Sequence, residues 1–598
     1  MNEKEDVLAT PKGEETPSAS TSPTQHPSDL SNSSLNVSRP EKIKSLWSRL
    51  GDLPEYPILP GRALLSGRAL NWSITLIANV GFCSFGYDQG VLSGLVTLDD
   101  FQKDIPLMAP FDPTREYCFE PNQCLGDENI QATGVAIYQV GCILGAVAVL
   151  VWGDAWGRRS STFWGIVLMI VGTVFQVALA GSPATTYALF VVGRVIGGLG
   201  NGAVTSTIPT WQSECAKAKN RGMIIMMSGA MIAFGIMISY WVVYGFYFAT
   251  GTIRWRFPLA FQCVFTIFVM IGVLFLPDSP RWLLLKGRRQ EALAVTARLA
   301  GKAEDDENVL AEFKQVEDAL KTQNAGGFKY SELLDRGPNR NLQRTLIAVC
   351  AQFFQQIGGI NLLTYYLALL LEQSLGFAPD LSRLISACNG TEYFLASLVA
   401  LPLVERSGRR VLMLVGAAGM SASMAVLAGT VSTGVVVDGA PVLDDGPGIA
   451  AVVMLFVFNT FFAVGWLGMT WLYPAEVTGL RIRIRANALA TISNWCFNFL
   501  IVMIGPPALA NIGYRTYIIF AVINAFIVPV VYFLFPETAH RSLEEIDVIF
   551  ASAKERGMSA VKQSLTMEKL VGEDLDASVE KYLGAEARAR GKGPDHVA

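Results

Sequence analysis

Long apolar segments alternate with short polar clusters along most of the chain. Twelve runs of about twenty or more residues carry almost no charge, which predicts twelve membrane-spanning helices. A polar segment with helical periodicity, residues 278–345, separates the sixth run from the seventh. The pattern therefore predicts an all-α membrane protein in which short linker helices join two sets of six spans. The expected spans are 71–92, 130–152, 160–181, 187–209, 222–245, 257–277, 346–372, 380–404, 410–432, 449–474, 486–510 and 514–535.

The composition excludes several classes of function. The chain is 51% apolar and 16% charged, whereas an ordinary soluble chain carries about 25% charged residues. It has no basic stripe that would bind nucleic acid, and its three histidines, His26, His540 and His596, lie outside the apolar runs. Neither a histidine-based metal site nor a nucleophile–base pair is visible. We therefore expect no enzyme, no cofactor and no nucleic-acid partner.

The distribution of lysine and arginine predicts the orientation in the bilayer. These residues gather in the turns after spans 2, 4, 8 and 10, and the turns after spans 3 and 9 have none. By the positive-inside rule, both termini and the central segment are expected in the cytoplasm. The loop on the other side contains Cys118 and Cys124, and whether they form a disulfide is left open. The expected parts are a mostly disordered tail 1–70, a bundle 71–277, a linker 278–345, a bundle 346–536 and a tail 537–598.

The two halves repeat a set of motifs. The turn GDAWGRR at 153–159 follows span 2, and ERSGRR at 405–410 follows span 8. A glutamate precedes an arginine by seven residues after span 4 and again after span 10, and a proline followed by an acid closes each half. The nearly constant offset between these pairs indicates a duplicated six-helix unit. Transporters built in this way bind their substrate near the midplane, between the halves.

The acids and arginines of these motifs predict ion pairs at the cytoplasmic rim. Seven residues make two helical turns, so each Glu–Arg pair can lie on one helix face. Glu214 is expected to meet Arg221 or Arg158, and its counterpart in the second half to meet Arg483 or Arg409. For the arginines alone, a simple topology signal is the alternative. The complete predicted latch comprises Asp154, Arg158, Arg159, Glu214, Arg221, Glu405, Arg409, Arg410, Glu476 and Arg483.

The first span contains a single charged residue, Asp88. A carboxylate at membrane depth costs roughly 3 kcal/mol on insertion scales, so it must be paired, protonated or in use. Arg194 is the only charge within span 4 and is the expected partner. An aspartate paired with an arginine stays ionised, whereas one separated from its cation takes up a proton. The pair is therefore a candidate for proton coupling, with a purely structural ion pair as the alternative.

The ordered motifs resemble the sugar porter family of the major facilitator superfamily over residues 71–550. The resemblance implies the major facilitator fold, with two pseudo-symmetric six-helix bundles, and gives Asp88 and Arg194 the coupling role. The segments NLQRTLIA, NWCFNF and PETAHRSLEEIDVIFA are similar to fungal members, both glycerol/proton symporters and hexose or pentose importers. The motifs that carry the resemblance are Gly86-Tyr87-Asp88, GDAWGRR, Gly193-Arg194, PDSPRWL at 277–283, Gln355-Gln356, Gly359-Ile360-Asn361, ERSGRR, Tyr473-Pro474-Ala475-Glu476, Asn494-Trp495 and PETAHRSLEEID at 536–547.

Neutral amides in spans 7 and 11 are the candidate substrate ligands. Amides both donate and accept hydrogen bonds, which suits a polyhydroxylated solute; the alternative is that they join helices within the membrane. Trp471 offers a flat face for a sugar ring or belongs to the interfacial belt, and Gly358 and Gly359 should let span 7 bend or break. The expected substrate residues are Gln355, Gln356, Asn361, Trp471 and Asn494, with Tyr365 and Tyr366 covering the site from outside.

Three positions depart from the family pattern. Gly229 replaces a usual glutamine in span 5, and Tyr393, with Glu392 beside it, stands where an asparagine is frequent. Ala155 follows Asp154 where the family commonly has Arg or Lys. The first two remove sugar hydrogen bonds and leave the substrate open. Glu392 is either a second intramembrane acid or a residue near the outer end of its span.

Together these features predict a monomeric transporter of the fungal plasma membrane. It would import a sugar or polyol in symport with a proton, by alternating access through the bilayer. Two alternatives stay open. One is a facilitative uniporter, against which Asp88 argues. The other is a non-transporting nutrient sensor on the same fold, and such sensors carry longer cytoplasmic tails than the one found here.

Overall fold

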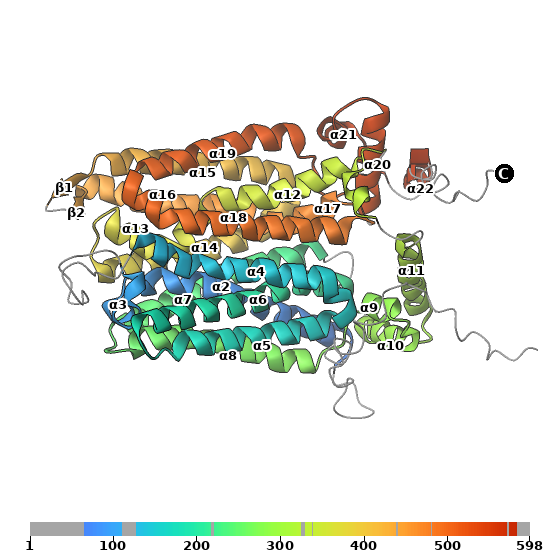
Figure 1. The fold of residues 1–598 in the computed structure, drawn as a ribbon. Helices are drawn as coiled ribbons and strands as arrows, with labels where there is room; N and C mark the ends of the chain where they lie inside the picture. The colour runs from blue at the N-terminus through green and yellow to red at the C-terminus, as the bar shows by residue number, and fades with distance from the viewer. Residues whose placement is uncertain are drawn as a thin grey trace, which may run out of the picture. The chain divides into compact units, whose positions relative to one another are not determined.

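The structure is a computed structural model that describes residues 65–109, 127–216, 221–324, 329–337, 339–437, 440–479, 481–570, 573–579 and 581–582. Helices predominate in this part of the chain (Figure 1). One short antiparallel hairpin, β1 (Val435–Val437) and β2 (Ala440–Val442), pairs Val435 with Val442. Most of the predicted N-terminal tail, Cys118 and Cys124 lie outside the described residues.

Six long helices form the N-terminal half, and each overlaps a predicted span, with α6 continuing to Cys215, beyond the predicted end at 209. The short α3 (Asp99–Asp104) and η1 (Pro106–Met108) follow the first of them. The six are α2 (Gly67–Leu95), α4 (Glu128–Trp156), α5 (Arg158–Val177), α6 (Pro183–Cys215), α7 (Arg221–Tyr247) and α8 (Ile253–Leu274).

The C-terminal half repeats this plan, but its first and fourth spans are interrupted. Span 7 consists of α12 (Asn341–Ile357) and α13 (Ile360–Gln373), and span 10 of α16 (Asp445–Phe462), the π-helical turn η4 (Ala463–Leu467) and α17 (Met469–Val477). Gly359 has φ +101°, which glycine adopts without a steric penalty, so the predicted break in span 7 is confirmed. The unbroken helices are α14 (Pro379–Ser407), α15 (Arg409–Ser432), α18 (Arg483–Ile512) and α19 (Arg515–Leu534).

Short helices gather at one end of the long ones. The linker forms α9 (Pro280–Leu285), α10 (Arg289–Ala300), α11 (Glu307–Asn324) and η3 (Tyr330–Leu334). The chain after α19 forms α20 (Leu543–Glu555), α21 (Ala560–Thr566) and α22 (Glu573–Val579). Figure 1 shows α9, α10, α11, α20 and α21 at the same end of the long helices, with β1, β2 and α3 at the opposite end. We call these the linker end and the hairpin end.

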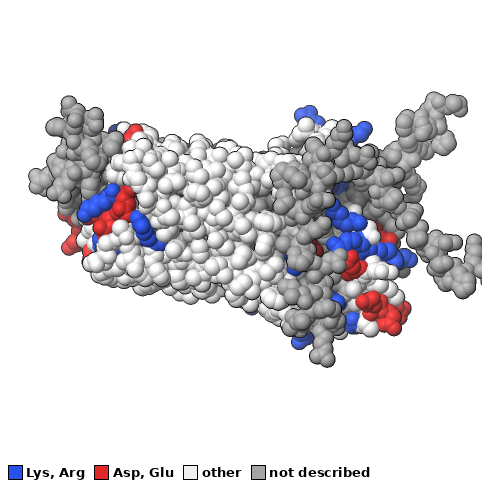
Figure 2. Space-filling view, turned by 60° about the horizontal axis from the view of Figure 1, so that its bottom comes forward, with Lys and Arg blue, Asp and Glu red and all other residues white. Residues whose placement is uncertain are grey.

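The surface and the helix lengths fit a bilayer. In the part of the chain that the structure describes, eleven helices, with the interrupted ones counted whole, are long and apolar enough to cross a membrane. The twelfth is α2, whose 29 residues include the polar Asn79, Ser84 and Asp88, all buried inside the protein. Figure 2 shows a broad band without charged side chains between two charged ends. The predicted fold of twelve membrane helices is thereby confirmed.

Small residues bring α4 and α6 into backbone contact. A Cβ atom at Gly198 would lie 2.1 Å from the carbonyl oxygen of Tyr138, and one at Gly141 would lie 2.3 Å from that of Val195. Such close approach is the usual way in which membrane helices pack. It places the side chain of Arg194 on α6 directly over the ring of Tyr138 on α4.

Candidate functional site

Asp88 and Arg194 form a buried ion pair in the N-terminal half. The Nη1 atom of Arg194 donates to both carboxylate oxygens of Asp88 at 3.1 Å, and the two side chains are 0–2% exposed. The guanidinium also donates to the carbonyl of Val135 and lies 4.2 Å from the centre of the Tyr138 ring. The predicted partnership is thus present, in a setting where each charge depends on the other for its stabilisation.

The chemistry open to this pair follows from its burial. The Nε atom of Arg194 is buried without a hydrogen-bond partner among the described residues, so Asp88 is the main counter-charge of the guanidinium. A movement that separates the two side chains would leave a carboxylate in a low dielectric, where the protonated form is favoured. Asp88 can therefore be stabilised either by the Arg194 guanidinium or, when the helices move apart, by a bound proton.

Five amide side chains form a continuous hydrogen-bonded chain in the C-terminal half. The Nδ2 atom of Asn494 donates to Gln352 at 2.6 Å and to Gln355 at 2.9 Å. Gln356 donates to Gln355 at 3.0 Å, and Asn361 donates to Gln356 across the break between α12 and α13. The structure thus brings four predicted substrate residues together. It adds Gln352, which the sequence signals only by standing three residues before Gln355, on the same helix face.

Side-chain amides bond to backbone carbonyl groups at both helix breaks. The Nε2 atom of Gln355 donates to the carbonyls of Trp466 and Leu467 in the π turn, at 3.2 and 3.3 Å. At the other break, Asn524 on α19 donates to the carbonyl of Gly358 at 2.8 Å. Irregular backbone within a membrane protein is tolerated where its polar groups find partners inside the protein. Asn524 is a residue that sequence reasoning missed.

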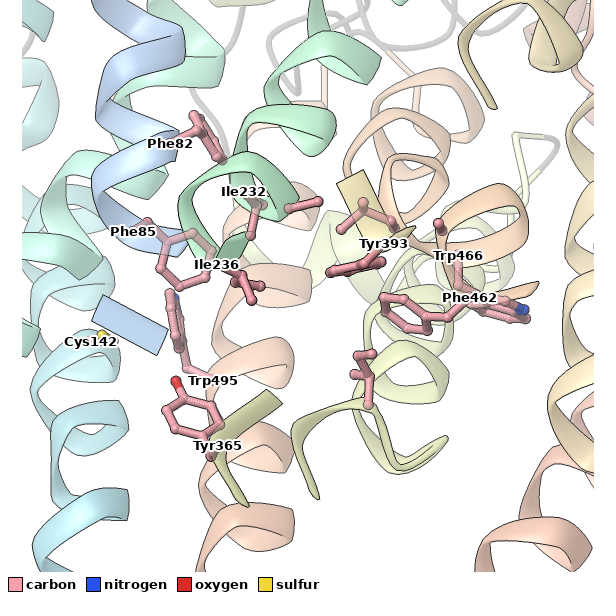
Figure 3. Close-up of a cluster of buried hydrophobic side chains, with 14 of the residues drawn as sticks. Phe82, Phe85, Cys142, Ile232, Ile236, Tyr365, Tyr393, Phe462, Trp466 and Trp495 are labelled. Carbon is pink, nitrogen blue, oxygen red and sulfur yellow. The ribbon is translucent and has the colours of Figure 1, made fainter. Parts of the chain in front are cut away.

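The predicted aromatic residues take different positions. Trp471 on α17 meets Phe82 on α2 edge to face, with ring centres 5.9 Å apart, and so contacts the opposite half. Figure 3 shows Tyr365 beside Trp495, which packs on Phe85 at 5.3 Å. Tyr366 is fully buried and donates to the carbonyl of Val502 at 3.0 Å. In this conformation the Tyr366 hydroxyl joins α13 to α18.

The departure at position 229 has a steric explanation. A Cβ atom at Gly229 would lie 3.0 Å from the Cα atom of Gly468, so a side chain here requires α7 and span 10 to move apart by a few tenths of an ångström. The adjacent Ser228 instead lies within hydrogen-bond distance of Asn79 and Gln212, at 3.0 and 3.1 Å. This polar group in the N-terminal half has no clear sequence signal.

The rim of the N-terminal half brings together three of the residues predicted for the latch. Arg158 makes two hydrogen bonds of 3.0 Å to Glu214 and one of 3.2 Å to Asp154. The carboxylate of Asp278 accepts from the backbone N–H groups of Arg158 and Arg159, at 3.1 and 3.3 Å. Burial raises the pKa of Asp278, and these N–H groups and the Arg158 charge oppose that rise. Glu214 thus meets Arg158; the side chain of Arg221 lies outside the described residues.

The C-terminal half repeats this arrangement. Arg409 donates to Glu476 at 3.0 Å and to Glu405 at 3.4 Å. The carboxylate of Glu537 accepts from the backbone N–H groups of Arg409 and Arg410, both at 3.0 Å. Glu476 therefore meets Arg409, whereas Arg483, the other predicted partner, donates to the carbonyl of Thr478. In each half, one arginine joins two acids and a third acid caps the helix that begins with this arginine.

The glycine of each rim turn is required for two reasons. Gly157 and Gly408 have φ values of +88° and +82°, which side-chain-bearing residues rarely adopt. A Cβ atom at either position would lie 2.6 Å from a carboxylate oxygen, of Asp278 in the first half and of Glu537 in the second. The repeated sequence motif thus encodes a repeated three-dimensional turn.

A polar link joins the two halves at the hairpin end. Arg383 on α14 donates to Glu372 on α13 at 2.8 Å and to Thr97, which follows α2, at 2.6 Å. Its guanidinium also lies 4.6 Å from the centre of the Tyr247 ring on α7. Arg383 is only 2% exposed, although charged residues at helix ends are usually solvated. The sequence gives no pattern from which this link could be predicted.

Comparisons with known proteins agree along most of the chain. A family model described as "Sugar (and other) transporter" matches residues 74–550. The sugar transporter STL1 of Saccharomyces cerevisiae is 36% identical over 518 residues, which cover 86% of this chain and 87% of that protein. The high-affinity glucose transporter of Kluyveromyces lactis is 28% identical over 489 residues, 79% of this chain and 84% of the relative. Among solved structures, the proton:xylose symporter XylE of E. coli has a TM-score of 0.67 at 24% identity, covering 80% of this chain and 99% of XylE.

Proposed function

The chain belongs to the sugar porter family of the major facilitator superfamily, and on that premise we propose that it imports a sugar or polyol together with a proton. The protein would span the plasma membrane through two bundles, residues 71–277 and 346–536. The linker 278–345 and both termini would lie in the cytoplasm. In this orientation the linker end is cytoplasmic, and the hairpin end is extracellular.

The buried pair of Asp88 and Arg194 is the observation that carries the proton-coupling proposal. In the described conformation, the Asp88 carboxylate inside α2 is paired with one cation, Arg194, which stands on another helix, α6. Alternating access moves helices relative to one another. If this movement draws Arg194 away, Asp88 binds a proton; the return movement restores the ion pair and releases the proton.

The amide chain supports a neutral, hydroxyl-rich substrate. In the described conformation the amides of Gln355, Gln356 and Asn494 bond to one another. A polyol or sugar can replace these bonds with an equal number of its own, because hydroxyl groups also donate and accept. No charged side chain takes part in this hydrogen-bonded chain, which argues against an ionic substrate.

Uptake measurements in a transport-deficient yeast strain test the proposal. Labelled hexoses, pentoses and glycerol are supplied separately, each with and without a protonophore. We expect one of them to accumulate above its external concentration and this accumulation to collapse with the protonophore. Accumulation that ignores the protonophore would refute symport, and entry that never exceeds the external concentration would indicate the uniporter instead.

The variant Asp88→Asn addresses the site itself. The asparagine keeps the shape and hydrogen-bonding capacity of the aspartate but is fixed in a neutral state. We expect loss of uphill accumulation, with exchange of labelled for unlabelled substrate retained. Asp306→Asn is the matched control, since Asp306 pairs with Lys302 in the linker. An Asp88→Asn protein that still concentrates substrate would place the coupling proton elsewhere.

A further inference from the structure

A polar seam crosses from the core of the C-terminal half to its outer surface, between α14 and α16. Asn459 donates to Asn389 at 2.6 Å, and both asparagines are buried. Directly beside this pair, the Oγ1 atom of Thr460, the next residue on α16, lies 2.5 Å from the Oε1 atom of Glu392, one turn along α14. Glu392 is half-buried, and Thr460 is exposed.

This end of the seam lies on a lipid-facing surface. Glu392 stands near the middle of the span Pro379–Ser407. Leu395 and Val399, which share its helix face, are each 55% exposed. On α16, Val453 is exposed on the same face as Thr460. Exposed apolar residues at mid-span contact lipid in a membrane protein, so water does not solvate this carboxyl group from outside.

The contacts of Thr460 and Glu392 accommodate a protonated carboxyl group. Its hydroxyl has one hydrogen and stands near two acceptors, the carbonyl of Phe456 at 3.1 Å and the carboxyl of Glu392. The Thr460 hydroxyl can donate its hydrogen to Glu392 or to Phe456; with a protonated Glu392, the carboxyl O–H donates to Thr460 and both contacts become hydrogen bonds at once. The Oε2 atom of Glu392 is buried without a partner among the described residues, a costly position for an ionised oxygen.

Among the described residues, no cation is placed to compensate a charge at this position. The elements packed against α14 are α7, α13, α15, α16 and η4. Every charged residue of these elements stands within the first two or last two positions of its helix. The titratable side chains close to Glu392 include Cys388 and Tyr393 on its own helix and Tyr240 on α7, which meets Gly390. Neither a thiol nor a tyrosine neutralises a carboxylate, so the protonated acid is the form that fits.

We propose that Glu392 is a second proton-binding site, separate from Asp88, and that it is a neutral acid in the described conformation. Its hydrogen bond to Thr460 joins α14 to α16 just before the π turn, whose Trp466 and Leu467 carbonyls hold Gln355. Loss of the proton would place an unpaired charge in this seam and separate the two helices. The site thereby links protonation of the C-terminal half to the span that positions the amide chain.

Labelling with a hydrophobic carbodiimide tests this proposal without a transport assay. The acid proton moves to one carbodiimide nitrogen, and the carboxyl oxygen bonds to the central carbon to give an O-acylisourea. In a dry site the acyl group then shifts to nitrogen, which yields a stable N-acylurea with no atom lost. Purified full-length protein in lipid nanodiscs is treated with dicyclohexylcarbodiimide over a range of pH, and its peptides are quantified by mass spectrometry.

We expect the adduct on Glu392, with little on the buried and ion-paired Asp88. Above the midpoint of titration, the labelling should fall about tenfold per pH unit, because only the protonated acid reacts. Glu392→Gln provides the blank for peptide assignment. The matched control is Glu291→Gln, which changes an exposed acid of α10 and should keep the adduct on Glu392. An unmodified Glu392 in folded wild-type protein would overturn the proposal, as would labelling that does not change with pH.

Discussion

The cost of an unpaired charge dominates at the scale of single residues. Arg194 is fully buried with Asp88 as its counter-charge, so Arg194→Ala leaves a carboxylate unpaired. Removing one partner of a buried ion pair costs roughly 3–5 kcal/mol. We expect a clear loss of thermal stability in detergent, together with protonation of Asp88 and loss of pH-dependent uptake. The double variant Asp88→Asn/Arg194→Ala should recover part of the stability; strictly additive losses would show that the two residues do not interact.

The amide chain makes a second prediction at this scale. Gln355→Ala removes the link between Asn494, Gln356 and the π turn. We expect a substrate KM raised about tenfold or more, which corresponds to about 1.4 kcal/mol or more of lost binding, at normal surface expression. Gln290→Ala, on the exposed face of α10, is the matched control. Kinetics equal to those of the control would show that Gln355 only joins helices.

Predicting these residues from the sequence succeeded where a residue type was unusual for its surroundings. Asp88 was conspicuous because no other charge occurs in its span. Gln352 and Asn524 were missed because an amide within a membrane helix can equally join helices, and their partners are remote in sequence. Arg383 was missed because it stands in the first turns of its helix, where charges are ordinary.

At the scale of elements, the two interrupted spans differ in how well the sequence predicts the interruption. The break in span 7 follows from the Gly358-Gly359 pair, whereas the π turn in span 10 contains no proline and no Gly-Gly pair. Its position depends on tertiary contacts, such as the approach of Gly465 to Gly416 on α15. Helix boundaries were predictable because long apolar runs end at polar turns; interruptions within a run depend on packing that the pattern does not contain.

Gly359→Ala tests the break in span 7. The residue has φ +101°, and an added Cβ would meet the Phe520 ring at 2.8 Å, so strain and a clash combine. Strained backbone alone costs of order 1–3 kcal/mol. We expect strongly reduced uptake and a lower unfolding temperature. Gly513 has φ +53° but open space around it, so Gly513→Ala measures the backbone strain without a clash. Gly429→Ala is the control that introduces neither strain nor a clash. Equal effects in Gly359→Ala and Gly513→Ala would argue against a specific role of the break.

At the scale of the whole molecule, the duplication extends to individual atoms of the rim. The pairs Arg158–Glu214 and Arg409–Glu476 occupy equivalent places in the two halves, both at 3.0 Å. The sequence predicted this repeat because the motifs recur at nearly one offset. It could not decide between the alternative arginines, since each stands at a spacing compatible with contact.

Arg158→Ala should weaken the rim of the N-terminal half. The change leaves Glu214 nearly buried without its cation and removes the charge that counters the burial of Asp278. We expect the free energy of unfolding to fall by roughly 3 kcal/mol, as is typical when one partner of a buried ion pair is removed. The unfolding temperature and the rate of uptake should both be lower. Arg289→Ala is the matched control, because its pair with Glu317 is exposed. If the two variants behave alike, the rim arginine is a topology signal only.

Proton movement by the purified protein tests the coupling of Asp88 to transport most directly. The wild-type protein and Asp88→Asn are reconstituted in liposomes that contain a pH-sensitive dye, and the substrate identified by uptake is added outside. We predict that inward flux of substrate acidifies the lumen of wild-type liposomes, whereas Asp88→Asn exchanges substrate without any change of pH. Substrate entry into wild-type liposomes without acidification would contradict the symport mechanism.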